Sequence, residues 1–251
     1  LGPIKSRNTH RKRSAQLVRG LDVTIHQFDS RQQLDLQLAD KVAKVLADDL
    51  STSGSAILVV SGGRTPRGLF TELSRIDIDW ARVLITLADE RWVDDQHADS
   101  NHKLVRENLC VERAAPAQFV PLKNAAESAR QGEADCAAAL AALGRFSLVL
   151  LGMGDDGHTA SLFPGAPELS RGLDLHSGID CLAIQPTAAT HERMSLSLPR
   201  LLNTRQIVLH LAGTEKLQVL ERVRAGSDVA EYPVRGVLQQ QAAAVDIYYA
   251  D

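Results

Sequence analysis

The segment FSLVLLGMGDDGHTASLFPG, residues 146–165, decides the fold, because an apolar run in it passes directly into glycines and charged side chains. Phe146–Leu151 is apolar except for Ser147, which is typical of a strand buried on both faces of a parallel sheet. Three further runs share this character, Ala56–Val60, Val83–Leu87 and Ile207–Leu211. The four runs predict four strands in the core of one sheet.

Helical patterns separate these runs. Residues 31–50 place Leu34, Leu38 and Val42 at helical spacing, and the Ala-rich stretch 125–143 is also typical of a helix. Strands alternating with helices predict an α/β fold with a doubly wound, mostly parallel sheet flanked by helices. We find no internal repeat or linker and expect a single domain over residues 21–251.

Composition excludes several classes of protein. The chain has 251 residues, a formal charge of −3 and three widely spaced cysteines, which do not form a metal or disulfide pattern. No apolar run is long enough to cross a bilayer, and no signal-peptide pattern opens the sequence. We therefore expect a reduced, cytoplasmic protein that does not bind a membrane.

Residues 1–20 form a basic arm that begins at Leu1. A basic arm can bind nucleic acid, but we interpret this one as a solvated tail or a remnant of processing or engineering. We expect no nucleic-acid partner. Its basic residues are Lys5, Arg7, Arg11, Lys12, Arg13 and Arg19.

The segment Ser61–Pro66, which follows the predicted strand Ala56–Val60, resembles a phosphate cradle. Gly62 and Gly63 allow a tight turn with free backbone N–H groups, and the expected helix start after Pro66 favours an anion. An ordinary strand-to-helix turn is the alternative.

Lys216 comes early in another expected helix, where it opposes the helix dipole unless it meets a bound anion. An exposed lysine is the alternative there.

Residues 152–157, which follow the predicted strand Phe146–Leu151, match the dinucleotide pattern Gly-x-Gly-x-x-Gly. The match is weak because prolines at 164 and 167 end any long helix that such a site needs. His158 at this strand end is better suited to act as a general base, with Asp156 orienting its imidazole or anchoring the loop. A structural histidine is the alternative.

Asp89-Glu90-Arg91 brings two acids and a guanidinium to another strand end. A structural ion-pair network would account for them, whereas a functional account has Arg91 facing an anionic or carbonyl oxygen. His97 and His102 lie in a polar loop that could bind a metal, but no zinc motif is present. We expect neither a metal nor a cofactor.

These motifs together resemble the 6-phosphogluconolactonase family, which is related to glucosamine-6-phosphate deaminases. Residues 151–165 are similar to the family signature, and four further motifs recur in the same order over about residues 55–220. They are Ser61–Pro66, Asp89–Arg91 with Asp99–Asn101 behind it, Arg193–Pro199 and Gly213–Lys216.

The resemblance implies hydrolysis of a small sugar-phosphate lactone, 6-phosphogluconolactone, with no cofactor. It implies His158 as the base that activates water. We add Asp156, which can orient His158, and Arg91, our candidate for stabilising the oxyanion, as further catalytic residues. It implies that the substrate and its phosphate contact eight further residues, Ser61, Gly62, Gly63, Arg64, Thr65, Asp89, Arg193 and Lys216. The family often has Ser at position 64, so Arg64 either adds a phosphate contact or points away.

Two positions distinguish this sequence from the deaminases. Those enzymes carry a Glu five residues after the histidine, where this chain has Phe163, and an aromatic residue at the position of Arg91. Both differences favour hydrolysis. An amino-sugar-phosphate deaminase or isomerase and a non-catalytic sugar-phosphate sensor remain as alternatives, and the oligomeric state, a monomer or a weak dimer, stays open.

Overall fold

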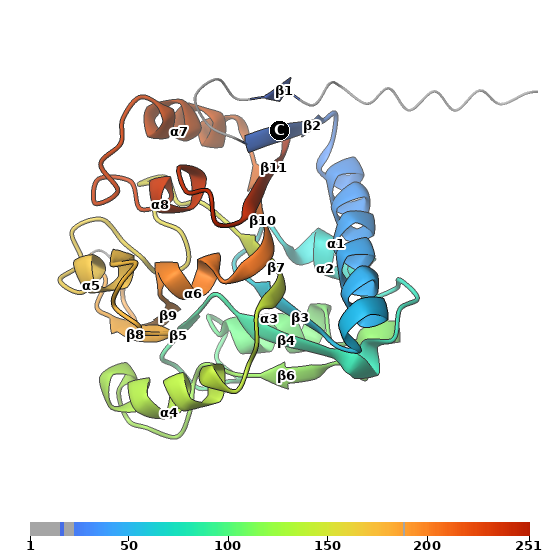
Figure 1. Cartoon of the computed structure of the whole chain (residues 1–251), viewed down its shortest axis with the longest axis horizontal. Coiled ribbons are helices and arrows are strands. Elements are labelled where there is room, and N and C mark those ends of the chain that lie inside the picture. Colours follow the sequence, from blue (N-terminus) through green and yellow to red (C-terminus); the bar gives the residue numbers. More distant parts are fainter. Residues whose placement is uncertain (1–15, 18–22, 188) are drawn as a thin grey trace, which may run out of the picture.

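The computed structural model describes residues 16–17, 23–187 and 189–251. Its centre is a sheet in the order β1-β2-β11-β10-β7-β3-β4-β6 (Figure 1). Among the described strands, the pairings in this sheet are parallel except that of β1 with β2. The strands are β1 (Gln16–Leu17), β2 (Val23–Phe28), β3 (Ala56–Val60), β4 (Val83–Leu87), β6 (Gln118–Val120), β7 (Phe146–Leu151), β10 (Thr204–Ala212) and β11 (Ala244–Ala250).

Helices cover both faces of the large sheet. Figure 1 shows α1 and α2 on one side of it and α6 and α8 on the other. The helices are α1 (Arg31–Ser53), α2 (Arg67–Leu73), α3 (Asn101–Asn108), α4 (Ala129–Ala141), α5 (Leu169–Leu173), α6 (Leu198–Leu202), α7 (Thr214–Arg224) and α8 (Arg235–Leu238). Two single turns of 3₁₀ helix are found at Trp80–Arg82 and Glu112–Ala114.

A second, antiparallel sheet has the order β5-β9-β8 and lies on the same side as α6 (Figure 1). It consists of β5 (Asp89–Arg91), β9 (Arg193–Leu196) and β8 (Cys181–Ile184). Because β5 follows β4 almost directly, the small sheet begins next to the carboxyl ends of the strands of the large sheet.

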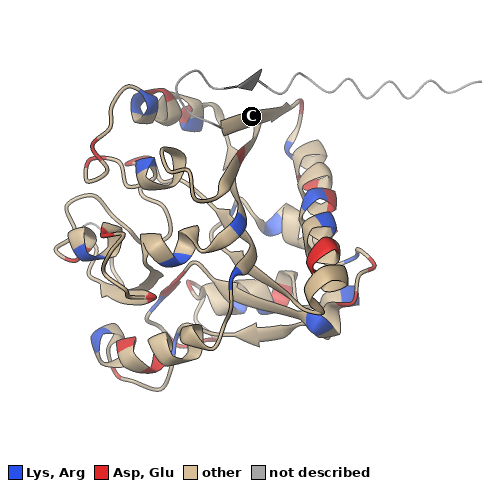
Figure 2. Ribbon diagram, viewed as in Figure 1, with Lys and Arg blue, Asp and Glu red and all other residues tan. Residues whose placement is uncertain are grey.

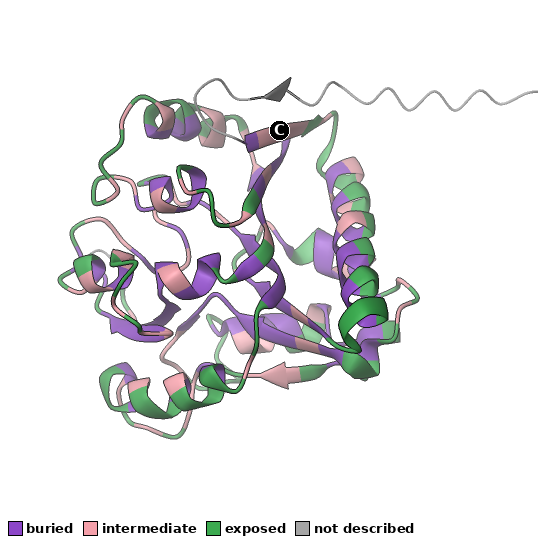
Figure 3. Ribbon diagram, in the orientation of Figure 1, coloured by how far each residue is buried: buried purple, intermediate pink, exposed green. Residues whose placement is uncertain are grey.

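Local sequence signals set the ends of α1. The Ser30 hydroxyl accepts a hydrogen bond from the Gln33 N–H at 3.2 Å, which satisfies one of the free donors at the helix start. Gly54 ends the helix with φ of +78°, a left-handed conformation that glycine adopts without strain. Burial follows the expected pattern, with the central strands buried and the outer faces of the helices exposed and charged (Figures 2 and 3).

The predicted fold class is confirmed, and three of the four predicted strands have the predicted bounds. The fourth, β10, extends beyond 207–211 to Thr204–Ala212 because its polar first residues also pair with β7. Within the expected basic arm, Gln16–Leu17 pairs with β2, while residues 1–15 and 18–20 lie outside the described part of the chain. None of the described helices is long and apolar enough to span a membrane.

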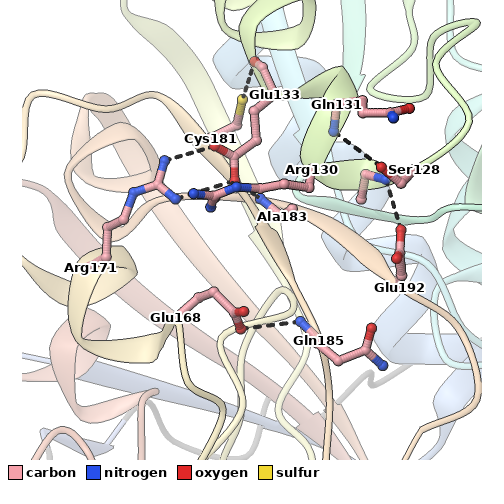
Figure 4. A network of polar contacts seen from close by, with 11 residues as sticks. Ser128, Arg130, Gln131, Glu133, Glu168, Arg171, Cys181, Ala183, Gln185 and Glu192 are labelled. Atoms are coloured by element: carbon pink, nitrogen blue, oxygen red, sulfur yellow. Dashed lines mark hydrogen bonds and ion pairs between the residues drawn. The ribbon is translucent and has the colours of Figure 1, made fainter.

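A partly buried carboxylate attaches the small sheet to α4. Glu133 on α4 accepts hydrogen bonds from the backbone N–H of Ala183 on β8 at 2.8 Å and from Arg171 at 2.9 and 3.2 Å (Figure 4). Arg130 adds a contact at 3.2 Å. Burial raises the pKa of Glu133, but the Arg171 hydrogen bond and the other contacts outweigh it and hold the pKa below its ordinary value.

We predict that Glu133→Gln lowers the free energy of unfolding by about 1–3 kcal/mol at neutral pH, because a partly buried, hydrogen-bonded charge is lost. The folded-state pKa is depressed, so this stabilisation is present above the unfolded-state pKa and disappears as the pH falls through the folded-state pKa. Urea unfolding of both proteins at neutral and acidic pH measures the difference. Glu107→Gln, at an exposed helix pair, is the control and should have little effect. Equal stability of the Glu133→Gln and unmodified proteins at neutral pH would contradict the prediction.

Candidate active site

A pocket of about 230 Å³ opens at the carboxyl ends of β3, β4, β7 and β10. In parallel α/β sheets this edge is the usual place for a ligand. The polar side chains and glycines that line it come from all four strand ends: Ser61, Gly62, Gly63, Arg64, Thr65, Asp89, Arg91, Asn101, Gly152, Gly154, His158, His210 and Lys216.

The loop after β3 has the shape expected of an anion cradle. A side chain at Gly62 would collide with Asn101, because a Cβ atom there would lie 1.8 Å from the Asn101 Oδ1. Gly63 has φ of +93°, which strains any other residue. Ser61 donates its backbone N–H to the Leu150 carbonyl at 3.0 Å, and its buried hydroxyl has no hydrogen-bond partner among the described residues. A ligand oxygen is therefore well placed to pair with that hydroxyl.

His158 and Asp156 form a pair on the loop after β7. The Nδ1 atom of His158 lies 2.5 Å from Oδ1 of Asp156, which also accepts the His158 backbone N–H at 3.1 Å. Burial raises the pKa of Asp156, but the hydrogen bonds and charge of His158 outweigh it and keep the pKa low. A Cβ atom at Gly154 would lie 2.1 Å from Nδ1 of His158, so glycine there lets the ring approach. Asp156 thus holds one ring nitrogen and leaves Nε2 available at the pocket.

No long helix follows these glycines. The described residues 152–168 form turns, with an isolated bridge between Thr159 and Leu162, before the short helix α5. Thr159 donates its hydroxyl to the Gly152 carbonyl at 2.9 Å. The segment lacks the helix that a dinucleotide site requires, as the sequence indicated.

The three charged residues of β5 have separate roles. The buried Glu90 accepts the backbone N–H groups of Asn101 and His102, at 2.8 and 2.7 Å, and so holds the start of α3. Burial raises its pKa. Asp89 accepts the Ser161 hydroxyl at 2.6 Å, which ties β5 to the loop that carries His158. Arg91 lines the pocket, and its NH1 donates to the Asp99 carbonyl at 2.5 Å.

Two of the expected binding residues, Arg193 and Lys216, make contacts that the sequence did not predict. Arg193 is buried on β9 opposite Arg91 and is not among the residues that line the pocket. Burial and the nearby Arg91 lower its pKa. Lys216 does line the pocket, and its Nζ lies 2.5 Å from Oδ1 of the exposed Asp155. An anion in the pocket can replace this exposed carboxylate as the partner of Lys216.

The expected loop residues Arg64 and Thr65 both line the pocket, Arg64 being exposed. Three residues that sequence reasoning did not assign to the site also contribute: Asn101, Ser161 and His210. Asn101 and Ser161 belong to motifs that the sequence had indicated, Asp99–Asn101 and residues 151–165, whereas His210 lies inside a predicted strand and gave no signal of its own.

His97 and His102, the two loop histidines considered as metal ligands, have different neighbours and do not form one site. His102 stacks on Phe119 with ring centroids 4.5 Å apart, and burial lowers its pKa. His97 instead lies close to Asp99 and His191, with candidate ligand atoms within 4.8 Å of one another. The His191 Nε2 is 3.0 Å from the Asp99 carboxylate. None of these three residues lines the pocket.

The fold and the pocket define the class: an α/β protein with a parallel sheet and a pocket, lined by glycines and polar side chains, at the carboxyl ends of its strands. The family model for "Glucosamine-6-phosphate isomerases/6-phosphogluconolactonase" matches residues 29–246. The chain therefore belongs to this family.

Among its relatives, a 6-phosphogluconolactonase of Rhizobium meliloti is 39% identical, over 92% of this chain and 100% of the relative. One from Pseudomonas putida is 39% identical over 90% and 93%. A solved 6-phosphogluconolactonase from Shewanella baltica OS155 is 44% identical and superposes with a TM-score of 0.89, covering 90% of this chain and 97% of that one.

We predict that chelation leaves catalysis unchanged, because the described pocket-lining residues form no cluster with metal-ligand geometry. The protein is dialysed against EDTA and assayed for lactone hydrolysis before and after addition of zinc. His191→Ala is the control, since it removes one potential ligand from the His97–Asp99–His191 cluster, which lies outside the pocket lining. A strong loss of activity that zinc restores in the unmodified protein would contradict a metal-free reaction.

Proposed function

We propose that this protein hydrolyses 6-phosphogluconolactone to 6-phosphogluconate in the oxidative pentose phosphate pathway, with His158 as the general base. The lactonase relatives, which match nearly the whole chain, support the reaction. The single observation that supports the mechanism is the His158–Asp156 pair at the pocket wall. Three free, buried cysteines suit the reducing cytoplasm.

The phosphate end of the substrate binds between the Ser61–Thr65 loop and Lys216. Backbone N–H groups of Gly62 and Gly63, the hydroxyls of Ser61 and Thr65 and the Lys216 ammonium are all donors suited to phosphate oxygens. On binding, the phosphate displaces Asp155 from Lys216. Anchoring this end holds the lactone carbonyl in one orientation beside His158, which lowers the entropic part of the barrier.

Proton transfer follows from the tautomer that Asp156 selects. The carboxylate accepts the Nδ1–H of His158, so Nε2 carries the free lone pair that takes a proton from water. The water oxygen attacks the carbonyl carbon and forms a tetrahedral intermediate. As this collapses, the bond to the ring oxygen breaks, and the His158 imidazolium returns the proton to that oxygen.

Arg91 stabilises the oxyanion of the intermediate. Its NH1 is held by the Asp99 carbonyl, while its buried Nε has no hydrogen-bond partner among the described residues. A guanidinium fixed in this way offers a free donor and a permanent charge where negative charge develops. Asp89 supports this arrangement by holding the loop that carries Ser161. The buried Arg193 adds positive charge next to Arg91.

The deaminase alternative lacks its proton-relay group in this chain. Phe163 stands at the position where the resemblance places the supporting Glu, and its ring lies 4.3 Å from the His158 ring. A phenyl ring shapes the pocket but transfers no proton. The fixed charge of Arg91 also disfavours an ammonium-bearing sugar. The sensor alternative gives no reason for an imidazole oriented by a carboxylate.

We predict that His158→Ala lowers kcat by roughly 10²- to 10⁴-fold, the usual contribution of a general base. Binding of 6-phosphogluconate, measured by calorimetry, should remain close to that of the unmodified protein, because the phosphate contacts are intact. His176→Ala, at an exposed histidine outside the pocket, is the matched control. Retention of most of the turnover in His158→Ala would remove this residue from the mechanism.

We predict further that the protein accelerates opening of 6-phosphogluconolactone well above its spontaneous rate and releases no ammonia from glucosamine 6-phosphate. The lactone is generated freshly and its unaided hydrolysis is followed in parallel, since this ester opens slowly in water. Ammonia release at a comparable rate would favour the deaminase. No acceleration of either reaction, with binding retained, would favour the sensor.

A further inference from the structure

His210 is a buried side chain of the pocket that the mechanism above does not use. It lies on β10, is 5% exposed and lines the pocket together with Ser61. Its Nδ1 has no hydrogen-bond partner among the described residues, and the same is true of the Ser61 hydroxyl. Buried polar atoms are almost always paired in folded proteins, so two unpaired ones in one pocket indicate a polar ligand there.

Asp35 lies behind His210, on the side away from Nδ1. Its Oδ1 is 3.6 Å from the His210 Nε2, and it belongs to α1. The same carboxylate faces the first turn of α2, where a Cβ atom at Gly68 would lie 2.0 Å from its Oδ2 and the backbone N–H of Leu69 hydrogen bonds to it. Asp35 therefore links His210 to the helix that follows the Ser61–Thr65 loop.

The position of this pair matches the phosphate end of the proposed substrate. On one side is the loop that enters α2, and on the other is the turn from β10 to Lys216. Arg31 of α1 reaches that turn, since its NH2 would be 3.8 Å from a Cβ atom at Gly213. His210 thus lies between the two segments assigned to the phosphate.

The protonation of the pair determines what Nδ1 can bind. When Asp35 is ionised, its charge 3.6 Å away favours the tautomer with the proton on Nε2, so that Nδ1 can only accept a hydrogen bond. A phosphate dianion also only accepts, so contact with Nδ1 requires one more proton on the pair. Burial, with Glu72 nearby, raises the pKa of Asp35 to about 6, whereas burial and Arg31 lower the pKa of His210 to about 4. The carboxyl is the group that gains the proton more easily, and an adjacent dianion raises its proton affinity further.

We propose that His210 is a further phosphate-binding residue, and that the Asp35–His210 pair takes up one proton when the phosphate binds. The proton on Asp35 is donated to Nε2, and Nδ1–H then donates to a phosphate oxygen. This proposal rests on the proposed function, because it takes the ligand to be a sugar phosphate.

Several charged and titratable groups of the described residues surround the Asp35–His210 pair. The proton uptake has to be distinguished from titration of these groups, which come from each element around the pair: Arg31 on α1, Glu72 on α2, Arg64 in the loop after β3, Lys216 on α7 and Tyr248 opposite His210 on β11. Burial raises the pKa of Tyr248 to about 12, so it does not titrate near neutrality.

The test is calorimetric titration with 6-phosphogluconate in two buffers of different ionisation enthalpy, at about pH 7.5, where the phosphate is already a dianion. We expect the unmodified protein to take up about one proton on binding. His210→Leu should weaken binding roughly 10-fold or more, the effect of losing a hydrogen bond to a charged group, and should abolish the uptake. His210→Asn, whose amide N–H lies near the position of Nδ1, should recover much of the affinity without the uptake.

Matched variants separate this effect from general damage. His26→Asn alters another histidine that faces a carboxylate, at 3.4 Å from Asp246, but outside the pocket, and should bind and take up a proton as before. Lys216→Ala should weaken binding yet keep the uptake. Circular dichroism and thermal unfolding check that each variant is folded. Proton uptake by His210→Asn equal to that of the unmodified protein would overturn the proposal.

Lactone hydrolysis by the unmodified protein is measured in parallel, so that two failures can be told apart. If the unmodified protein hydrolyses the lactone but the His210 variants bind and take up protons unchanged, the role of His210 is wrong and the proposed function stands. If the unmodified protein neither hydrolyses the lactone nor binds 6-phosphogluconate, both are wrong.

Discussion

The parallel pairing of β10, β7, β3 and β4 is the constraint on which the site depends. Because all four strands run in one direction, their carboxyl ends reach the same edge, and four loops distant in sequence meet around one pocket. Each strand is buried on both faces, so its apolar register is fixed by both helix layers. A one-residue slip in any strand would rotate the loop after it and separate His158 from the Ser61–Thr65 loop.

The pocket's accuracy then depends on the contacts that join those loops to one another. Asn101 packs against Gly62 and donates to the Asp89 carbonyl at 2.8 Å, while Asp89 accepts from Ser161. Glu90, one residue further, holds the start of α3. The acids of β5 therefore have a structural role, because they connect three loops, although Asp89 also lines the pocket beside Arg91. Glu133 supports the same arrangement from outside by holding the small sheet to α4.

Sequence could predict the parts of this architecture that depend on local pattern. Continuous apolar runs gave the bounds of β3, β4 and β7, and glycines beside charged residues marked the strand ends. It could not predict pairings between distant short segments, such as β5 with β9, which carry too few residues for a periodic signal. For the same reason the burial of Arg193 and the contact between Lys216 and Asp155 were not foreseen, since each depends on a partner far along the chain.

The two pocket histidines show why residue type alone does not assign a role. His158 stands on a loop, is 30% exposed at its side chain and is held by an ionised carboxylate, so it can exchange protons with water. His210 stands on a central strand, excluded from solvent, and faces a carboxyl whose pKa is raised to about 6 rather than lowered. The first environment favours a base that turns over with each reaction cycle. In the second, an adjacent anion raises the proton affinity of the carboxyl further, which suits the phosphate recognition that we propose.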